Sequence, residues 1–391
     1  MALCSVSSAL WRVLAPYLTF PRNLKFRGRF VKEKDGTFET YTTIGAFLAD
    51  AFRRMIRLRS LVFELTSKEE SGSKPLFIWS VLAAALTTPH VLRISISGDA
   101  YEHRQIPTDL NIAPLTHFSY HQSIYRRNPR ATRGQYDLLA LILKKIYATL
   151  EELHCISESL SLRVLYEHDW PQLRVLYLYG QRFTPHNRPY ISILSRMRRL
   201  RELRLELANP AHVDRQAIWP PGFNFTYPWP ELERLTLTQP HPDDQLFAHL
   251  PRSMRRLDIR CWPHYSSIPK DGEHDWKAAL GIRWHMPLLM TSEMLGILRR
   301  CATPELEHLQ LEFRADTKCL DVLRYVTVAF SRLKVLQVHW YREDGVLDDP
   351  PIVRLFSSLL TRLATNEPFI LGCNRRYPCD AEGPPSASIA S

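Results

Sequence analysis

Four residues between positions 261 and 285 have side chains of the types that bind zinc: Cys261, His264, His274 and His285. The C-x-x-H spacing of the first two suits a pair of zinc ligands. The later spacings, of ten and eleven residues, match no compact zinc module. The chain has 15 histidines in all, so a few of them within one short segment are not unusual. We therefore expect ordinary surface or core histidines here, and no metal site.

Catalytic motifs are missing from the sequence. It has no phosphate-binding G-x-x-x-x-G-K-[ST] or G-x-G-x-x-G, no G-x-S-x-G and no H-E-x-x-H. The adjacent carboxylates Asp243–Asp244 and Asp348–Asp349 lie in polar segments flanked by proline, where solvated loop acids explain them better than general acid–base work. We expect neither a catalytic residue nor a cofactor, and a protein that is not an enzyme.

The net charge is +11, from 51 Lys+Arg against 40 Asp+Glu. A basic balance suits nucleic acid, an anionic membrane or an acidic protein. Two basic runs stand out, 125–134 and 196–204, and the second contains Leu200 and Leu203 as expected core residues. Because the basic residues are otherwise spread along the chain, solvated arginines are the favoured interpretation and nucleic acid is an unlikely partner.

The cellular compartment is indicated by cysteines and apolar stretches. Seven dispersed cysteines do not form a disulfide framework and are typical of a reducing compartment. The N-terminus lacks the charged region and continuous apolar core of a signal peptide, and the longest apolar stretch, 75–86, is too short to span a bilayer. These features predict a cytoplasmic or nuclear protein with no membrane partner.

One short phrase recurs along the chain, with apolar residues in its first, fourth and sixth places. The last two apolar residues have the period of a strand with one buried face. Stacked side by side, such short strands would form a parallel sheet with one continuous core. The gaps between copies are 22 to 35 residues apart from one of 52, which holds either a missed unit or an insertion. The ten copies begin at Leu58, Val91, Leu115, Leu150, Leu173, Leu200, Leu232, Met254, Leu306 and Leu333.

Segments with helical periodicity separate the phrases, as a crossover between parallel strands requires. They span 76–86, 136–150, 191–200, 292–300 and 320–330. Prolines precede many phrases and would end the helix before them; these are Pro89, Pro171, Pro230, Pro251 and Pro304. The sequence therefore predicts an α/β fold, an irregular leucine-rich-repeat solenoid of short parallel strands alternating with helices. The aromatic-rich segment 262–294 in the long gap is expected to pack on the array.

The first 30 residues do not belong to the repeat and predict a small helical segment. A helix with Trp11 on its apolar face is followed by Pro16 and a short apolar stretch. This resembles the C-terminal half of the F-box of fungal F-box proteins, and the matching residues are Cys4, Val6, Ser7, Trp11, Arg12, Pro16, Leu18 and Leu24. The Leu-Pro pair and first helix of that module do not precede them, so the resemblance implies a truncated F-box. A plain helical cap over the first repeat is the alternative.

The resemblance to the F-box implies a function and a partner. The chain would be a substrate-recognition subunit of an SCF-type ubiquitin ligase and would bind the adaptor subunit of the cullin ligase. The adaptor-binding residues implied in this way are Leu10, Trp11, Leu14, Pro16 and Leu18.

A target protein would bind on the concave face of the sheet, because residues between the leucines alternate outward on each strand. Tyrosine and arginine are frequent anchors of interfaces. The candidate residues are Arg93, His117, His154, Tyr177, Tyr179, Arg204, Thr236, Asp258, Gln310 and Gln337.

The expected organisation is a partial F-box-like segment at 1–30, a leucine-rich-repeat solenoid at 45–370 and a disordered tail at 371–391. Two other functions stay open. One is a leucine-rich-repeat scaffold without a role in ubiquitin transfer, and the other, less favoured, is a basic repeat protein that binds nucleic acid.

Overall fold

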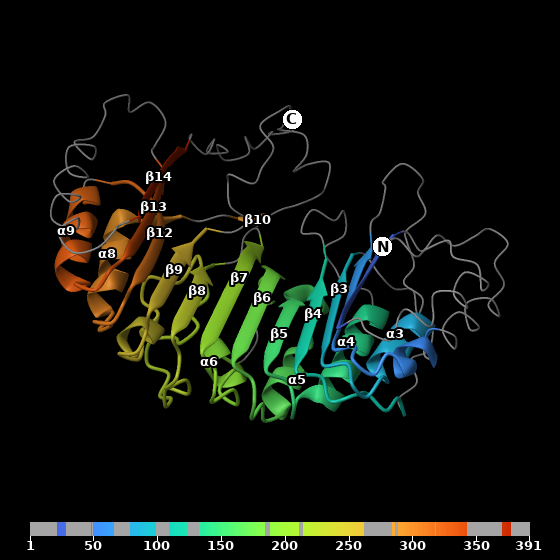
Figure 1. Cartoon of the computed structure of the whole chain (residues 1–391). Coiled ribbons are helices and arrows are strands. Elements are labelled where there is room, and N and C mark those ends of the chain that lie inside the picture. Colours follow the sequence, from blue (N-terminus) through green and yellow to red (C-terminus); the bar gives the residue numbers. More distant parts are fainter. Residues whose placement is uncertain are drawn as a thin grey trace, which may run out of the picture. The chain divides into compact units, whose positions relative to one another are not determined.

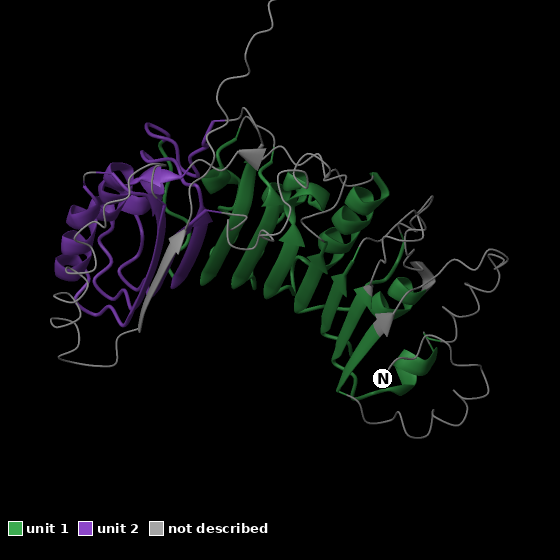
Figure 2. Cartoon of the chain, turned by 90° about the horizontal axis from the view of Figure 1, so that it is seen from above, with its two compact units in different colours: residues 1–213, 224–231, 271–284 green, residues 214–223, 232–270, 285–391 purple. Residues whose placement is uncertain are grey.

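A computed structural model of the chain describes residues 22–28, 48, 50–65, 79–98, 109–122, 133–183, 188–210, 214–261, 284–285, 288–316, 318–341 and 370–376. The chain divides into two compact units (Figure 2). Unit 1 comprises residues 1–213, 224–231 and 271–284, and unit 2 comprises 214–223, 232–270 and 285–391. The predicted adaptor-binding residues lie outside the described part of the chain.

Unit 1 contains a parallel sheet whose strands follow one another in chain order (Figure 1). Each strand pairs with the next in an unbroken register. Its described strands are β1 (Asn23–Gly28), β2 (Ser60–Leu65), β3 (Arg93–Ser97), β4 (His117–His121), β5 (Glu152–Ile156), β6 (Val175–Gln181) and β7 (Glu202–Pro210).

Unit 2 repeats the same construction. The parallel order is β8 (Arg234–Thr238), β9 (Arg256–Arg260), β12 (His308–Arg314), β13 (Val335–Tyr341) and β14 (Ile370–Arg376). The short β11 (Leu289–Met290) pairs with the end of β12 at Phe313 and Arg314. The first residue of the two-residue strand β10 (Trp284–His285) is assigned to unit 1 and the second to unit 2.

The ten phrases explain these strands. In every copy the first, fourth and sixth residues are at most 7% exposed, from Leu58, Leu61 and Phe63 in the first to Leu333, Leu336 and Val338 in the last. The predicted α/β fold of repeated parallel strands is confirmed. Each three-residue apolar set is too small to be stable alone, so the strands depend on their neighbours for burial.

Helices return the chain between strands, and α3, α4, α5 and α6 lie on one face of the unit 1 sheet (Figure 1). The described helices are α3 (Trp79–Leu86), α4 (Arg133–Ile146), α5 (Leu162–Glu167), α6 (Tyr190–Ile193), α8 (Thr291–Arg300) and α9 (Cys319–Ala329), with the 3₁₀ turns η3 (Ser157–Ser159) and η4 (Gln245–Ala248). Four of the five predicted helices form with small shifts of their ends. The fifth, predicted at 191–200, shrinks to four residues and continues as turns that lead into β7.

The prolines before the phrases lie in tight turns. Leu173 N–H donates to the Trp170 carbonyl, which places Pro171 second in a four-residue turn. The turns containing Pro89 and Pro304 have the same bond, from Val91 to Thr88 and from Leu306 to Thr303. Proline favours that second position because its φ is already fixed there. These prolines therefore form the turn that starts a strand, in addition to ending a helix.

The 52-residue gap is an insertion and holds no missed unit. Strand β9 pairs directly with β12 from Arg256↔His308 to Ile259↔Leu311, so no strand lies between them along that length. The described end of the insertion supplies β11 and α8, and Met294, Ile297 and Leu298 of α8 are buried.

The ends of the array differ from the expectation. Residues 23–28, assigned to the N-terminal segment, form β1 beside β2, and residues 371–376, assigned to a disordered tail, form most of β14 beside β13. Both segments lack the full phrase, but each pairs its backbone with the strand next to it. An edge strand leaves a row of backbone donors and acceptors unpaired, and the added strands satisfy that row.

Candidate partner-binding surface

The register of the strands defines which side chains share the face opposite the helices, called here the helix-free face. These are the third, fifth and seventh residues of each phrase, since the fourth and sixth are buried. In unit 1 the predicted residues Arg93 and His117 occupy third places. Fifth places hold His154, Tyr177 and Arg204, and Tyr179 occupies a seventh place.

Four rings on β4, β5 and β6 form a connected ring strip: His121, His154, Tyr177 and Tyr179. His121 stacks on Tyr179 with ring centroids 5.7 Å apart and meets His154 edge-on at 6.1 Å. Tyr177 contacts His154 at 5.5 Å and Tyr179 at 5.4 Å. Such offset and edge-on pairs are favourable beyond their burial, so the rings hold one another in place.

Arg204 on β7 ends the ring strip with a charge held over an aromatic ring. Its guanidinium carbon lies 4.3 Å from the centre of the Tyr177 ring, and its Nη2 donates to Glu206 Oε1 at 2.9 Å. The Tyr177 hydroxyl donates to the other oxygen of Glu206 at 2.6 Å. Burial and the neighbouring Glu206 carboxylate raise the pKa of Tyr177, which keeps this hydroxyl protonated. One carboxylate thus orients both residues before any partner arrives.

Glu152 performs the same task for two histidines at the other side of the strip. Its Oε1 lies 2.8 Å from His154 Nε2, and its Oε2 lies 3.2 Å from His117 Nε2. Hydrogen bonds from the two imidazoles hold the pKa of Glu152 well below its usual range. The His117 ring is fixed further by the Thr116 hydroxyl, 2.8 Å from its Nδ1.

The residues of this surface differ in how much of each side chain is exposed to a partner. Tyr179 is only 6% exposed, and its hydroxyl accepts from the Gln122 backbone N–H at 2.9 Å, so it supports the surface and offers little area to a partner. His154, Tyr177 and Arg204 are half-buried. Arg93 is exposed, is the register neighbour of His117 and has no side-chain partner among the described residues.

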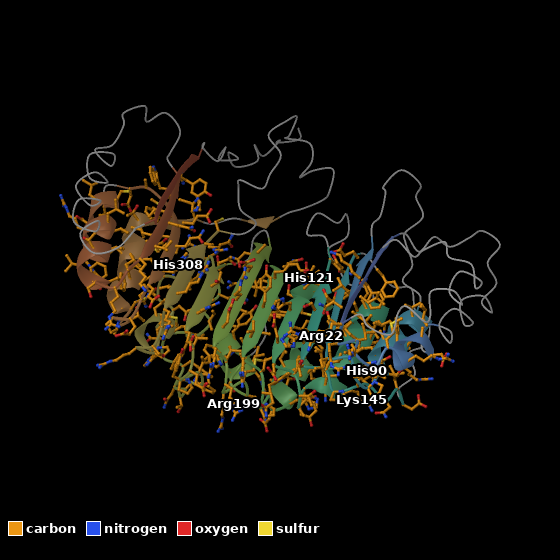
Figure 3. All side chains as sticks on the ribbon, in the orientation of Figure 1. Arg22, His90, His121, Lys145, Arg199 and His308 are labelled. Atoms are coloured by element: carbon orange, nitrogen blue, oxygen red, sulfur yellow. The ribbon has the colours of Figure 1, made fainter. Side chains whose placement is uncertain are left out.

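His121, labelled in Figure 3, makes the stability of unit 1 depend on pH. Burial, and then the charge of His154, lowers the pKa of His121 from 6.5 to about 4. The folded state therefore prefers the neutral ring. Its contribution to stability is complete above pH 6.5 and is lost as the pH falls toward 4.

We expect the chain to lose about 2 kcal/mol of unfolding free energy between pH 7 and pH 5 through this one ring. The variant His121→Phe keeps a ring against Tyr179 and should lose correspondingly less over the same interval. Urea unfolding of both proteins at the two pH values checks this. An equal loss in both proteins would assign the acid sensitivity to other groups.

The four predicted residues of unit 2 form a different kind of surface. Thr236, Asp258 and Gln310 are buried, at 4%, 1% and 6% exposure, and only Gln337 is half-buried. The Asp258 carboxylate is the centre of the group. Its Oδ2 accepts from Thr236 Oγ1 at 3.1 Å, from Arg256 Nε at 3.0 Å and from Arg260 Nη2 at 2.9 Å. His308 Nε2 lies 3.5 Å from Oδ1, an electrostatic contact longer than a good hydrogen bond.

Asp258, predicted as a contact residue, therefore orients the cations around it and is closed to a partner. Arg256 is 40% exposed along its side chain, and it is Arg256 that reaches solvent. Burial and the neighbouring Arg256 lower the pKa of His308 (labelled in Figure 3), so that the ring tends to be neutral beside the arginines.

Several members of these groups were missed in the sequence: His121, Glu152, Glu206, Arg256, Arg260 and His308. Each occupies the third or seventh place of a phrase from which another residue was predicted: His117, in the third place, for His121, and the residue in the fifth place for the others. Aligning all ten phrases on their fourth residue would have grouped them, because parallel strands in equal register bring equal places together.

The zinc candidates and the possibility of a membrane-spanning helix can also be compared with the described residues. Cys261, the first of the zinc candidates, is buried, and its sulfur accepts from Gln239 Nε2 at 3.8 Å. The described residues contain no group of three or more potential metal ligands. Within the same residues no helix has both the length and the apolar character needed to cross a membrane.

Comparison with known proteins gave no match, either to a protein-family model or to a curated protein.

Proposed function

We propose that this chain is a leucine-rich-repeat protein that binds another protein on the helix-free face of unit 1. The observation that carries the proposal is the ring strip together with Arg204. Tyrosine and arginine are enriched among residues that dominate binding energy. Here they are held by ring contacts and by the Glu206 carboxylate, so little conformational entropy remains to be lost when a partner binds.

The composition of the surface favours a protein over a small molecule. The ring strip and Arg204 together cross four adjacent strands, β4 to β7, which corresponds to about 14 Å between the outer two. It combines aromatic rings, two imidazoles and an arginine with the carboxylates Glu152 and Glu206. Aromatic residues and arginine are enriched in protein interfaces, and the two carboxylates here are already paired with these groups.

The test is a double variant, Tyr177→Ala with Arg204→Ala, in a differential capture of partners from cell extract. We expect specific partners of the unaltered chain to be reduced at least tenfold, because removal of two anchors usually costs more than 1.4 kcal/mol of binding energy.

The matched control is Tyr136→Ala with Arg163→Ala, which removes the same residue types from α4 and α5 on the opposite face of the sheet. Tyr136 is 40% exposed, and Arg163 is exposed. Partners that survive the first variant and are lost in the control would overturn the proposed surface.

The finer proposal is that the chain is the substrate-recognition subunit of an SCF-type ubiquitin ligase, with the adaptor subunit of the cullin ligase as its second partner. What supports it is the resemblance of the N-terminal residues to half an F-box, with Trp11 and Leu14 on one helical face. In that role the ring strip would hold the protein to be ubiquitinated. The alternative is a leucine-rich-repeat scaffold that binds on the same surface without a ligase.

A binding assay with purified adaptor separates the two. The ligase proposal expects capture of the adaptor by the whole chain and at least tenfold weaker capture by Trp11→Ala with Leu14→Ala. Failure of the unaltered chain to bind adaptor would remove the ubiquitin role and leave the scaffold.

A further inference from the structure

The second basic run of the sequence, 196–204, acquires neighbours in the fold. Leu200 and Leu203 are buried, as expected for core residues, whereas Arg198 and Arg199 are exposed in the turns before β7. Register places those turns beside the start of β6, where Arg174 directly precedes the strand. The turn before β5 follows α4, whose last residues include Lys144 and Lys145. Figure 3 shows Lys145 and Arg199 at the edge where the strands begin.

These five residues, Lys144, Lys145, Arg174, Arg198 and Arg199, are called here the basic edge. All five side chains are exposed, and within the described chain none of them is paired with a carboxylate. Arg199 donates to the neutral Gln172 at 3.1 Å. Two further arginines of the same edge, Arg196 and Arg201, already occupy the acids Asp169 and Glu231.

The five cations of the basic edge therefore leave a net positive charge that its acidic residues do not neutralise. Glu151, before β5, and Glu202, the first residue of β7, add two carboxylates to it, which do not cancel five cations. The end of α4 partly explains Lys144 and Lys145, since a helix C-terminus favours cations. No such local reason applies to Arg174, Arg198 and Arg199, which lie outside any helix.

The chemistry of this edge differs from that of the ring strip. Its apolar residues, Met197 and Leu200, are fully buried, and the large apolar side chains that are exposed elsewhere among the described residues, Ile56, Tyr136 and Val328, lie outside it. A protein partner would find no apolar anchor there, although protein interfaces depend on such anchors. Stable attachment to a membrane likewise needs buried apolar groups in addition to charge.

Nucleic acid has no such requirement, because release of counterions from its phosphates supplies most of the binding energy. We propose that the basic edge of unit 1 binds the phosphate backbone of nucleic acid without reading its sequence. The cations project from three consecutive repeats spaced about 4.8 Å apart, so they can follow a backbone that runs along the edge. Three of the five are arginines, whose planar fork matches phosphate oxygens in pairs.

The test measures binding of the whole chain to fluorescent duplexes of DNA and of RNA, about 20 base pairs long, and to single-stranded RNA, across salt concentrations. With five phosphate contacts, log K should fall against log salt with a slope of about −4.5 on duplexes, a loss of roughly 500-fold between 50 and 200 mM salt. The three probes distinguish duplex from single-stranded backbone and DNA from RNA. Binding to any of them with this salt dependence supports the proposal.

The key variant is Lys145→Gln, Arg174→Gln and Arg198→Gln, which takes one cation from each repeat. It should reduce the slope to about −2 and weaken binding by at least tenfold at low salt. The matched control, Arg133→Gln, Arg163→Gln and Lys318→Gln, removes the same number of cations from exposed sites that are not part of the basic edge. The Tyr177→Ala, Arg204→Ala variant should bind nucleic acid normally, which keeps this test separate from that of the ring strip.

Four outcomes would overturn the proposal. They are no binding at 50 mM salt, equal loss in the key variant and its control, tighter binding to polyglutamate than to nucleic acid, and tighter binding to vesicles rich in phosphatidylserine. The last two would identify an acidic protein or an anionic membrane as the partner.

Discussion

Replacement of Trp170 by alanine is expected to lower the unfolding free energy of the chain by about 4 kcal/mol, the cost of removing a large aromatic side chain from a core. Trp170 is 0% exposed in unit 1. Its indole Nε1 donates to the Leu165 carbonyl at 3.1 Å near the end of α5, and its backbone carbonyl closes the turn that begins β6. One residue therefore satisfies the end of a helix, fills the core and starts the next strand.

Urea unfolding followed by circular dichroism measures this effect. The variant Trp170→Phe keeps most of the volume and loses the donor, so its cost should be about 1 to 2 kcal/mol. Tyr136→Ala, at a partly exposed site, serves as the control for loss of an aromatic residue. A change below 1 kcal/mol for Trp170→Ala would contradict the role given to Trp170.

Asp258→Ala is expected to destabilise unit 2 by about 3 to 5 kcal/mol. The reason is that two arginines, one of them only 14% exposed along its side chain, would lose their counter-charge. Asp258 is 1% exposed and accepts hydrogen bonds from three side chains. Removing one partner of a buried pair leaves the other charge uncompensated, which costs more than the pair itself contributes.

Thermal and urea unfolding of the variant measure this cost. The combination Asp258→Leu with Arg260→Met tests its origin, since replacing the whole pair with apolar residues should restore much of the lost stability. Asp243→Ala, an exposed aspartate of the same unit, should change the unfolding free energy by less than 0.5 kcal/mol. Equal effects of Asp258→Ala and Asp243→Ala would show that the buried network does not stabilise the unit.

The strands of this fold could be predicted closely because their signal is local. Leucines at Leu173, Leu176 and Leu178 have the spacing of a short strand with one buried face, and Pro171 lies in the turn before them. The same logic located the other nine copies. Strands β1 and β14 escaped because their segments lack the apolar first residue of the phrase. They keep only its last two apolar places, Leu24 and Phe26 in β1 and Leu371 and Cys373 in β14.

The binding surface was predicted only in part, because the residues that meet on the helix-free face are determined by the register between neighbouring repeats. His154, Tyr177 and Arg204 were found on single strands, but the carboxylates that orient them, Glu152 and Glu206, act across strands or from a different place in the phrase. Burial was harder still. Asp258 and Tyr179 alternate outward like their exposed neighbours, and only the packed structure closes them off.

The basic edge shows the same limit. The charge of the run 196–204 can be read from the sequence. That Arg174 lies beside this run follows only from the register of β6 and β7. Within unit 1 the fold thus separates two kinds of surface, rings with paired polar groups on the helix-free face and unpaired cations at the edge where strands begin.

The central claim, that the helix-free face of unit 1 binds a protein, is tested most directly by photo-crosslinking from single positions. A photoreactive phenylalanine analogue placed at Tyr177 should form a crosslink to a partner protein in cells, whereas the same analogue at Tyr136 on α4 should not. Crosslinks from position 136 with none from position 177 would contradict the account.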